Sequence, residues 1–169
     1  MSTRFVIDPL DFVRNASTHH AKIAVGELLR LQDYLYESIG TLSYQISGIY
    51  DARNKPNLHI KVEGEIVLCC QRCLDKLHHT LDLQTVVLLA KNEFELDKVD
   101  KDDAIDAILA TSNLDVLDLI EDEIILSLSI SSRHLDGECE ILKPEEAQEN
   151  INENNDNPFY ALKKLKKTH

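Results

Sequence analysis

The residues of this chain best suited to chemistry are three cysteines and a histidine, arranged as two short-spaced pairs. Cys70 and Cys73 form a C-x-x-C pair, and His134 and Cys139 follow later in the chain. Tetrahedral zinc takes thiolate and imidazole ligands, and structural sites are commonly built from two such pairs. The four residues are therefore a candidate Cys3His site for one structural zinc ion.

Two other interpretations of the C-x-x-C pair stay open. Cys70 continues the inward phase of the preceding strand pattern, so it could pack as a small core residue without metal. The pair could also carry thiol redox chemistry, which favours a helix N-terminus that lowers a thiol pKa. The residues after Cys73 predict a strand instead, and Arg72 is the only local aid to a thiolate. Cys69 points away from the inward side.

Sequence motifs for other kinds of catalysis are absent. The chain has no G-x-S-x-G nucleophile motif, no phosphate-binding glycine loop and only five glycines. The acidic run Glu121-Asp122-Glu123 is better explained as the surface of a helix than as an acid–base pair. We therefore expect a protein that is not an enzyme and has no small-molecule substrate.

Three predicted strands must position the cysteines. Apolar and polar residues alternate over residues 41–50, 58–68 and, after the C-x-x-C pair, 77–89. Sequential strands with short connections indicate an antiparallel meander, because parallel pairing needs long crossovers. The C-x-x-C pair then lies in the second hairpin turn.

The strongest helical pattern covers residues 115–128. Asp115 can act as its N-cap, and apolar residues occupy most of its circumference. A helix this apolar should be packed on more than one side. Residues 28–39 show a weaker helical spacing of leucines, and residues 91–103 suggest a solvated acidic loop.

The end of the chain differs in composition from the rest. Residues 143–156 are acidic and rich in asparagine, which predicts a flexible linker. Asn157-Pro158 can begin a short helix within residues 157–169. We expect residues 1–142 to form a single domain. The predicted fold class is α+β: an antiparallel β-meander packed against one long apolar helix, with a short C-terminal helix on the polar linker.

The charge is unevenly distributed along the chain. The net charge is −12, but residues 157–169 contain four lysines and no acid, which leaves −16 on the preceding 156 residues. A body this acidic repels phosphate backbones, which favours a basic protein partner or RNA contact confined to the tail. Solubility alone would also explain the acidic body. The candidate partner-binding residues are Phe159, Leu162, Lys163, Lys164, Lys166 and Lys167.

Targeting signals are also missing from the sequence. The N-terminal residues include no apolar signal-peptide region, and no run approaches the roughly 18 apolar residues needed to cross a membrane. Four cysteines without an export signal suggest reduced thiols rather than a disulfide scaffold. We expect a cytoplasmic protein that does not contact a membrane.

Several motifs occur in an order that is specific when they are taken together. They are Asp8-Pro9-Leu10, Cys70-Gln71-Arg72-Cys73-Leu74, the helical segment 118–128, the pair His134 and Cys139, and Asn157-Pro158-Phe159-Tyr160-Ala161-Leu162. In these motifs the chain resembles the YceD family of large ribosomal RNA subunit accumulation proteins. It departs from the family at Ser129, where a proline is usual, and at His134, where many relatives carry another cysteine.

The resemblance implies a bacterial, non-enzymatic ribosome-biogenesis factor. Such a factor would support the synthesis, processing or stability of large-subunit (23S) ribosomal RNA by binding a partner in an assembly intermediate, either a basic ribosomal protein or the rRNA. The alternative from another functional class is a thiol–disulfide oxidoreductase or redox-sensing protein that uses Cys70 and Cys73.

Overall fold

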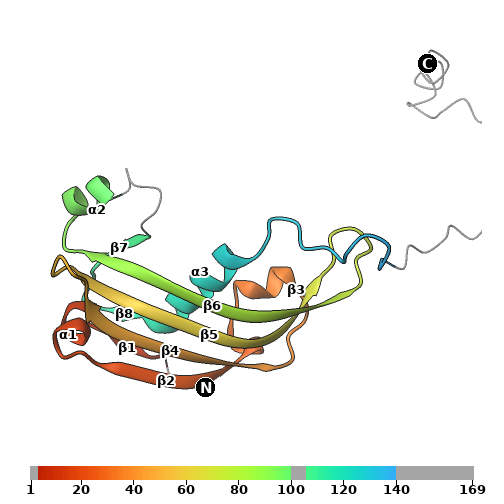
Figure 1. Ribbon diagram of the computed structural model, residues 1–169. Helices are drawn as coiled ribbons and strands as arrows, with labels where there is room; N and C mark the ends of the chain where they lie inside the picture. The colour runs from red at the N-terminus through yellow and green to blue at the C-terminus, as the bar shows by residue number, and fades with distance from the viewer. Residues whose placement is uncertain (1–3, 100–105, 140–169) are drawn as a thin grey trace, which may run out of the picture. The chain divides into compact units, whose positions relative to one another are not determined.

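The computed structural model describes residues 4–99 and 106–139, and all statements about the structure below concern these residues. Its strands and helices alternate irregularly along the chain (Figure 1). They are β1 (Val6–Ile7), α1 (Pro9–Arg14), β2 (Thr18–Ala24), the 3-10 helices η1 (Val25–Glu27) and η2 (Leu31–Tyr34), β3 (Leu35–Glu37), β4 (Thr41–Tyr50), β5 (Pro56–Cys69), β6 (Lys76–Ala90), α2 (Glu93–Val99), β7 (Ala107–Leu109), β8 (Leu114–Asp115) and α3 (Val116–Ser127).

A six-stranded sheet organises the described part of the chain. Its order is β2-β4-β5-β6-β7, and β3 pairs with β5 beyond the end of the β4 pairing. Figure 1 shows β4, β5 and β6 running side by side along the sheet. Only the β6–β7 pairing is parallel; the other pairings within this sheet are antiparallel. A separate two-stranded sheet pairs β1 with β8, which brings the start of the described chain next to the start of α3.

The three long strands form where the side chains alternate between apolar and polar. In β4, Leu42, Tyr44 and Ile46 are buried while Ser43 and Gln45 are exposed. Alternate residues of a strand point to opposite faces, so this pattern buries one face of the sheet and solvates the other. The buried face carries the core, which α1, η1, η2 and α3 help to cover.

Helix α1 begins where the sequence favours a helix start. The Asp8 carboxylate accepts hydrogen bonds from the backbone N–H groups of Leu10 and Asp11, and Pro9 occupies the first helical position. The helix then packs directly over Gly48 of β4. A Cβ atom at Gly48 would lie 2.6 Å from the Cα atom of Val13, so only glycine fits beneath the helix.

The predicted fold class is wrong. The described residues form a predominantly β structure with short helices, not a meander covered by one long apolar helix. Helix α3 has 12 residues, and Leu128 at its C-cap already has an extended backbone. Its buried residues, among them Ile120 and Ile124, share the core with residues of α1 and the two 3-10 helices. Its outer side is open to solvent at Leu126, which is 76% exposed.

Three local predictions are also corrected by the structure. Residues 28–39 form no α-helix; they contain η2 and β3, and the latter pairs with β5. The expected acidic loop at residues 91–103 contains the seven-residue helix α2. In the acidic run of α3, Glu121 and Glu123 are buried rather than on the helix surface.

The predicted linker at residues 143–156 and the predicted helix within residues 157–169 lie outside the described residues. So does the boundary at residue 142 of the expected single domain. Among the helices that the structure does describe, none is long and apolar enough to span a bilayer.

Candidate metal centre

The first half of the candidate site is the turn between β5 and β6. These strands pair up to Cys69, opposite Lys76, and the residues between them form a compact loop. The backbone N–H of Leu74 donates a hydrogen bond to the carbonyl of Cys70 at 2.8 Å, and Leu74 adopts a left-handed backbone with φ 61°. The N–H of Cys70 donates to the carbonyl of Asp75 at 3.0 Å. The turn is therefore held by its own backbone.

The second half is the segment that follows α3. It has no helix or strand between residues 128 and 139, and its exposed apolar residues, such as Ile130 and Leu135, contribute nothing to the core. Hydrogen bonds attach it to the turn instead. The N–H of Gln71 donates to the carbonyl of Ser132 at 2.9 Å, and the Arg72 guanidinium donates to the carbonyl of Leu135 at 3.0 Å.

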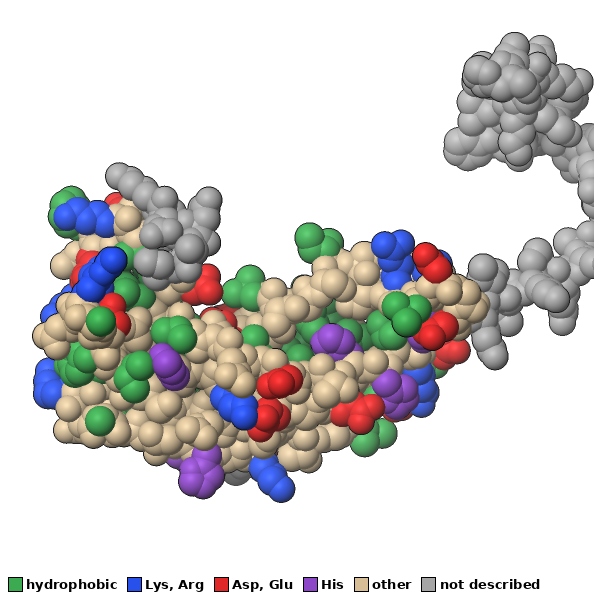
Figure 2. All heavy atoms as spheres, in the orientation of Figure 1, with side chains coloured by type: hydrophobic (Ala, Val, Ile, Leu, Met, Phe, Trp, Pro, Cys, Tyr) green, Lys and Arg blue, Asp and Glu red, His purple; other side chains and the backbone are tan. Residues whose placement is uncertain are grey.

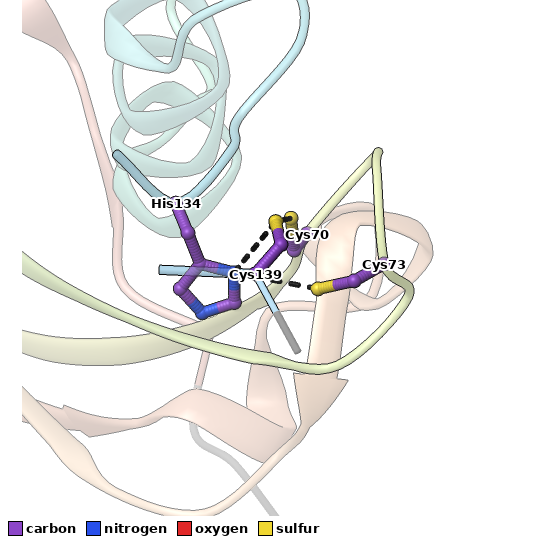
Figure 3. A group of neighbouring side chains, drawn as sticks. All are labelled: Cys70, Cys73, His134 and Cys139. Carbon is purple, nitrogen blue, oxygen red and sulfur yellow. Dashed lines mark hydrogen bonds between the residues drawn. The ribbon is translucent and has the colours of Figure 1, made fainter. Parts of the chain in front are cut away.

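The two halves bring the four candidate ligands together. One ligand atom each from Cys70, Cys73, His134 and Cys139 lies within 4.8 Å of each of the others. The Cys70 and Cys139 sulfurs are 3.7 Å apart, and the His134 Nδ1 atom is 3.4 Å from the Cys73 sulfur and 3.6 Å from that of Cys139. Figure 3 shows the side chains pointing toward one another from the turn and from the segment after α3. All four cysteines of the chain are free thiols.

Two further residues orient the cluster. The Nε2–H of His134 donates to the carbonyl of Lys76 at 2.8 Å, which fixes the ring so that Nδ1 faces the sulfurs. Arg72 reaches across the site: its Nε–H donates to the Cys139 sulfur at 2.9 Å and its Nη1 to Asp136 at 2.9 Å.

Neighbouring groups shift the pKa values of three side chains in the cluster. Burial would raise the pKa of the Cys70 thiol, but hydrogen bonds around Cys73, His134 and Arg72 outweigh burial and lower that pKa to about 5. The sulfur of Cys139, together with the Lys76 carbonyl, raises the pKa of His134 to about 9. A hydrogen bond at Asp75 lowers the pKa of Cys73, but burial and the neighbouring thiols raise it to about 11. One thiolate beside an imidazolium is an arrangement in which a metal cation can replace the proton.

Three thiols and an imidazole offer the donor atoms of a tetrahedral metal site, so this cluster could hold a metal ion. The same thiols are also close enough for disulfide chemistry. All four metal-ligand candidates named from the sequence therefore meet at one place. Phe159, Leu162 and the four tail lysines lie outside the described residues.

Sequence reasoning missed two contributors to this part of the fold. Arg72 joins the turn to the segment after α3 through four contacts, although it was expected only to favour a thiolate. Its place inside the C-x-x-C pair was the available signal. Glu121 accepts two backbone hydrogen bonds, from Arg30 and Leu31, inside the fold. The only signal there was an acidic run within a helix that is otherwise mostly apolar.

Comparison with known protein families places the fold and the cluster in context. Residues 58–166 match the family described as "Large ribosomal RNA subunit accumulation protein YceD". The matched range contains most of β5, all of β6 and α3, the four residues of the cluster and most of the lysine-rich tail; Asp8-Pro9-Leu10 lies before it. No curated protein and no solved structure gives a significant match. Because the match covers more than half of its residues, this chain belongs to the YceD family, whose description associates it with the accumulation of large-subunit ribosomal RNA.

Proposed function

We propose that this protein is a non-enzymatic factor in the biogenesis of the large ribosomal subunit. It supports the synthesis, processing or stability of 23S rRNA by binding a component of an assembly intermediate in the bacterial cytoplasm. The observation that carries the proposal is the family match over residues 58–166, which reaches from β5 into the lysine-rich tail.

The charge distribution supports a division of labour within the chain. The first 156 residues carry a net charge of −16 and the last 13 carry +4. On the face seen in Figure 2, basic and acidic side chains of the described residues are interspersed, and they do not gather into one basic patch. Such a surface gives phosphate backbones little attraction, whereas a basic ribosomal protein would be attracted by the net charge.

The tail is proposed as the part that contacts the assembling particle. Phe159 and Leu162 would supply apolar contacts, and Lys163, Lys164, Lys166 and Lys167 would supply positive charge near rRNA phosphates.

Depletion of the protein in its host, followed by ribosome profiling, tests the role in the cell. We expect fewer large subunits and a lower ratio of 23S to 16S rRNA, and rescue by the wild-type gene. Unchanged large subunits and unchanged 23S rRNA after depletion would contradict the proposed function.

Tail variants test the proposed contact. Deletion of residues 157–169, or replacement of the four lysines by glutamine, should weaken association with pre-ribosomal particles in pull-downs. Replacement of the same lysines by arginine is the matched control, because it retains the charge. Phe159→Ala combined with Leu162→Ala separates the apolar from the electrostatic contribution. Undiminished association of the deletion variant would remove the tail from the proposal.

One observation favours the redox alternative, namely that three thiols lie within 4.8 Å of one another. Against it, Cys70, the thiol of the pair whose pKa is lowered, is 0% exposed, so a substrate disulfide has no direct access to it. An insulin-reduction assay distinguishes the two functions. Turnover by the wild-type protein that Cys70→Ser abolishes would support the oxidoreductase.

A further inference from the structure

We propose that Cys70, Cys73, His134 and Cys139 bind one Zn²⁺ ion in a closed tetrahedral site. The role of the ion is structural: it fastens the segment after α3 to the turn between β5 and β6. This inference concerns the architecture of the protein and does not depend on which ribosomal partner it binds.

The first support is the agreement of the measured distances with a zinc tetrahedron. Zinc–sulfur bonds of about 2.3 Å and zinc–nitrogen bonds of about 2.0–2.1 Å require ligand–ligand edges of about 3.8 Å for two sulfurs and about 3.6 Å for sulfur and nitrogen. The measured edges are 3.7 Å for Cys70–Cys139, 3.4 Å for Cys73–His134 and 3.6 Å for Cys139–His134. Three of the six ligand–ligand edges therefore match the tetrahedron, and the other three are no longer than 4.8 Å.

The second support is the orientation of the histidine. A ligating imidazole commonly donates its other N–H group to a carbonyl or carboxylate, which sets both the tautomer and the ring direction. The Nε2–H of His134 makes this contact with the Lys76 carbonyl at 2.8 Å. Its Nδ1 atom consequently faces the sulfurs, and we assign Nδ1, once deprotonated, as the metal ligand.

The third support is the shape of the turn that presents Cys70 and Cys73. Leu74 adopts its left-handed backbone immediately after Cys73, and its N–H closes the loop onto the Cys70 carbonyl. A non-glycine residue in this conformation is held there by its surroundings at some cost in free energy. Leu74 is 68% exposed, so packing of its side chain does not explain the strain. Within this turn, the sulfurs of Cys70 and Cys73 lie within 4.8 Å of each other.

Arg72 places positive charge beside the site. Three thiolates, a neutral imidazole and Zn²⁺ leave one net negative charge, and the Arg72 Nε–H lies 2.9 Å from the Cys139 sulfur. Its Nη2 donates to the carbonyls of His134 and Leu135, and its Nη1 pairs with Asp136. The same side chain therefore places positive charge beside the site and positions two ligands. Arg72 is a positioning residue and not a ligand.

The donor set selects the class of metal. Thiolate and imidazole ligands suit zinc, whereas magnesium and calcium require oxygen ligands. Four protein ligands leave no open position for a water or a substrate, which is the arrangement of structural rather than catalytic zinc. The segment after α3 has few buried apolar contacts of its own, so a metal ion would add to the hydrogen bonds that attach it to the turn.

Metal analysis of full-length protein, expressed with zinc in the medium and purified without chelator, tests the site. We expect about one zinc per chain in the wild type. Cys73→Ser and His134→Ala should bind zinc at least tenfold more weakly. Two matched controls are available: Cys69→Ser removes a neighbouring thiol outside the cluster, and His78→Ala removes an exposed histidine of β6. Both should retain zinc.

If a ligand variant folds poorly, cobalt spectroscopy of the wild-type protein still tests the geometry of the site. Cobalt added to the chelator-stripped wild-type protein should give the intense visible bands and sulfur-to-metal charge transfer of a tetrahedral thiolate site. In His134→Cys, a spectrum shifted toward four thiolates, or lost binding, supports His134 as a ligand, whereas an unchanged spectrum contradicts it. Hydrogen exchange within residues 129–139 should slow when zinc is bound.

Three outcomes would overturn the proposal. These are wild-type protein that neither contains nor takes up zinc, an octahedral cobalt spectrum, and equal zinc loss in Cys69→Ser and Cys73→Ser. None of them bears on the ribosome profiles after depletion, so the zinc site and the proposed function can fail separately.

Discussion

The Glu121 carboxylate lies 2.9 Å from the backbone nitrogen of Leu31, a residue 90 positions earlier in the chain. The same Oε1 atom accepts a second hydrogen bond from the N–H of Arg30 at 2.6 Å. These N–H groups stand at the start of η2, where helical geometry leaves backbone donors without partners. An acid of α3 therefore caps a helix that is distant in sequence, and the neighbouring Asp122 forms an ion pair with Arg30.

Loss of this cap should destabilise the fold. Glu121→Ala leaves two N–H groups without their acceptor, one of them buried, and we expect the free energy of unfolding to fall by about 2–4 kcal/mol. Glu121→Gln retains an acceptor oxygen and should lose about half as much. Urea unfolding measures both, with Asp118→Ala on the exposed side of the same helix as the control, expected to cost about 0.5 kcal/mol. Equal losses for alanine and glutamine would contradict the capping role.

A methyl group at Gly48 should disrupt the contact between α1 and β4. Its carbon would lie 2.6 Å from the Val13 Cα atom and 2.9 Å from the Phe12 carbonyl oxygen, and backbone atoms cannot move aside without displacing the helix. We expect Gly48→Ala to lower stability by about 1–3 kcal/mol. Gly26→Ala is the matched control, because its added carbon would meet only the Ser38 carbonyl at 3.5 Å. Thermal unfolding of the two variants should separate them clearly; similar melting temperatures would argue against the clash.

Glu123 should make stability depend on pH. Burial raises the pKa of this carboxylate above its ordinary 4.5; a hydrogen bond with Thr85 opposes the increase, and the nearby Asp106 and Asp122 add to it. The folded state then holds the proton more tightly than the unfolded state. Stability accordingly decreases as pH rises from about 4.5 through the raised pKa of the folded state.

Substitution by glutamine isolates this contribution. Glu123→Gln cannot ionise, so its stability relative to the wild type should increase as pH rises through that window and then level off. Urea unfolding at a series of pH values measures the difference, with Asp118→Asn as the control for loss of an exposed carboxylate from the same helix. A difference between Glu123→Gln and wild type that does not change with pH would contradict the effect.

Arg72 should strengthen zinc binding without being a ligand. Arg72→Ala removes the donor to the Cys139 sulfur and the contacts to two ligand-segment carbonyls, and we expect zinc affinity to fall about 10- to 100-fold while one zinc still binds. Arg72→Lys retains the positive charge but loses the planar guanidinium with its several N–H donors. The zinc affinity of this variant should therefore lie between those of wild type and Arg72→Ala. Competition with a chromophoric chelator measures the affinities, with Arg53→Ala in the exposed β4–β5 turn as the control. An affinity for Arg72→Ala equal to that of wild type would leave Arg72 without a role at the site.

The strands were predictable because alternation is a local property. The alternating residues 41–50, 58–68 and 77–89 correspond to β4, β5 and β6, whose ends differ from the predicted ends by at most two residues. The start of α3 was predictable for the same reason, since Asp115 caps it by accepting from the N–H of Leu117. For the three strands and the start of α3, side-chain periodicity and short-range hydrogen bonds are enough to predict the element.

The fold class and several elements were not predictable in this way. The leucines of residues 28–39 have helical spacing, but pairing of β3 with β5 and capping of η2 by Glu121 prevail over that local preference. The acids of α3 were expected on its surface because they are charged. Glu121 is buried because distant backbone donors satisfy its carboxylate, and periodicity cannot show such a partner.

The amino-acid sequence by itself determined which faces of the long strands are apolar, where α3 begins and which four residues have the chemistry of a metal site. Only the tertiary structure decided that Cys70 and Cys73 meet His134 and Cys139, and that Arg72 and the Lys76 carbonyl orient them. The physical reason is the range of the interactions. Capping and alternation act over a few residues, whereas the contacts that assemble the cluster join residues up to 69 positions apart and exist only once the sheet and α3 have packed together.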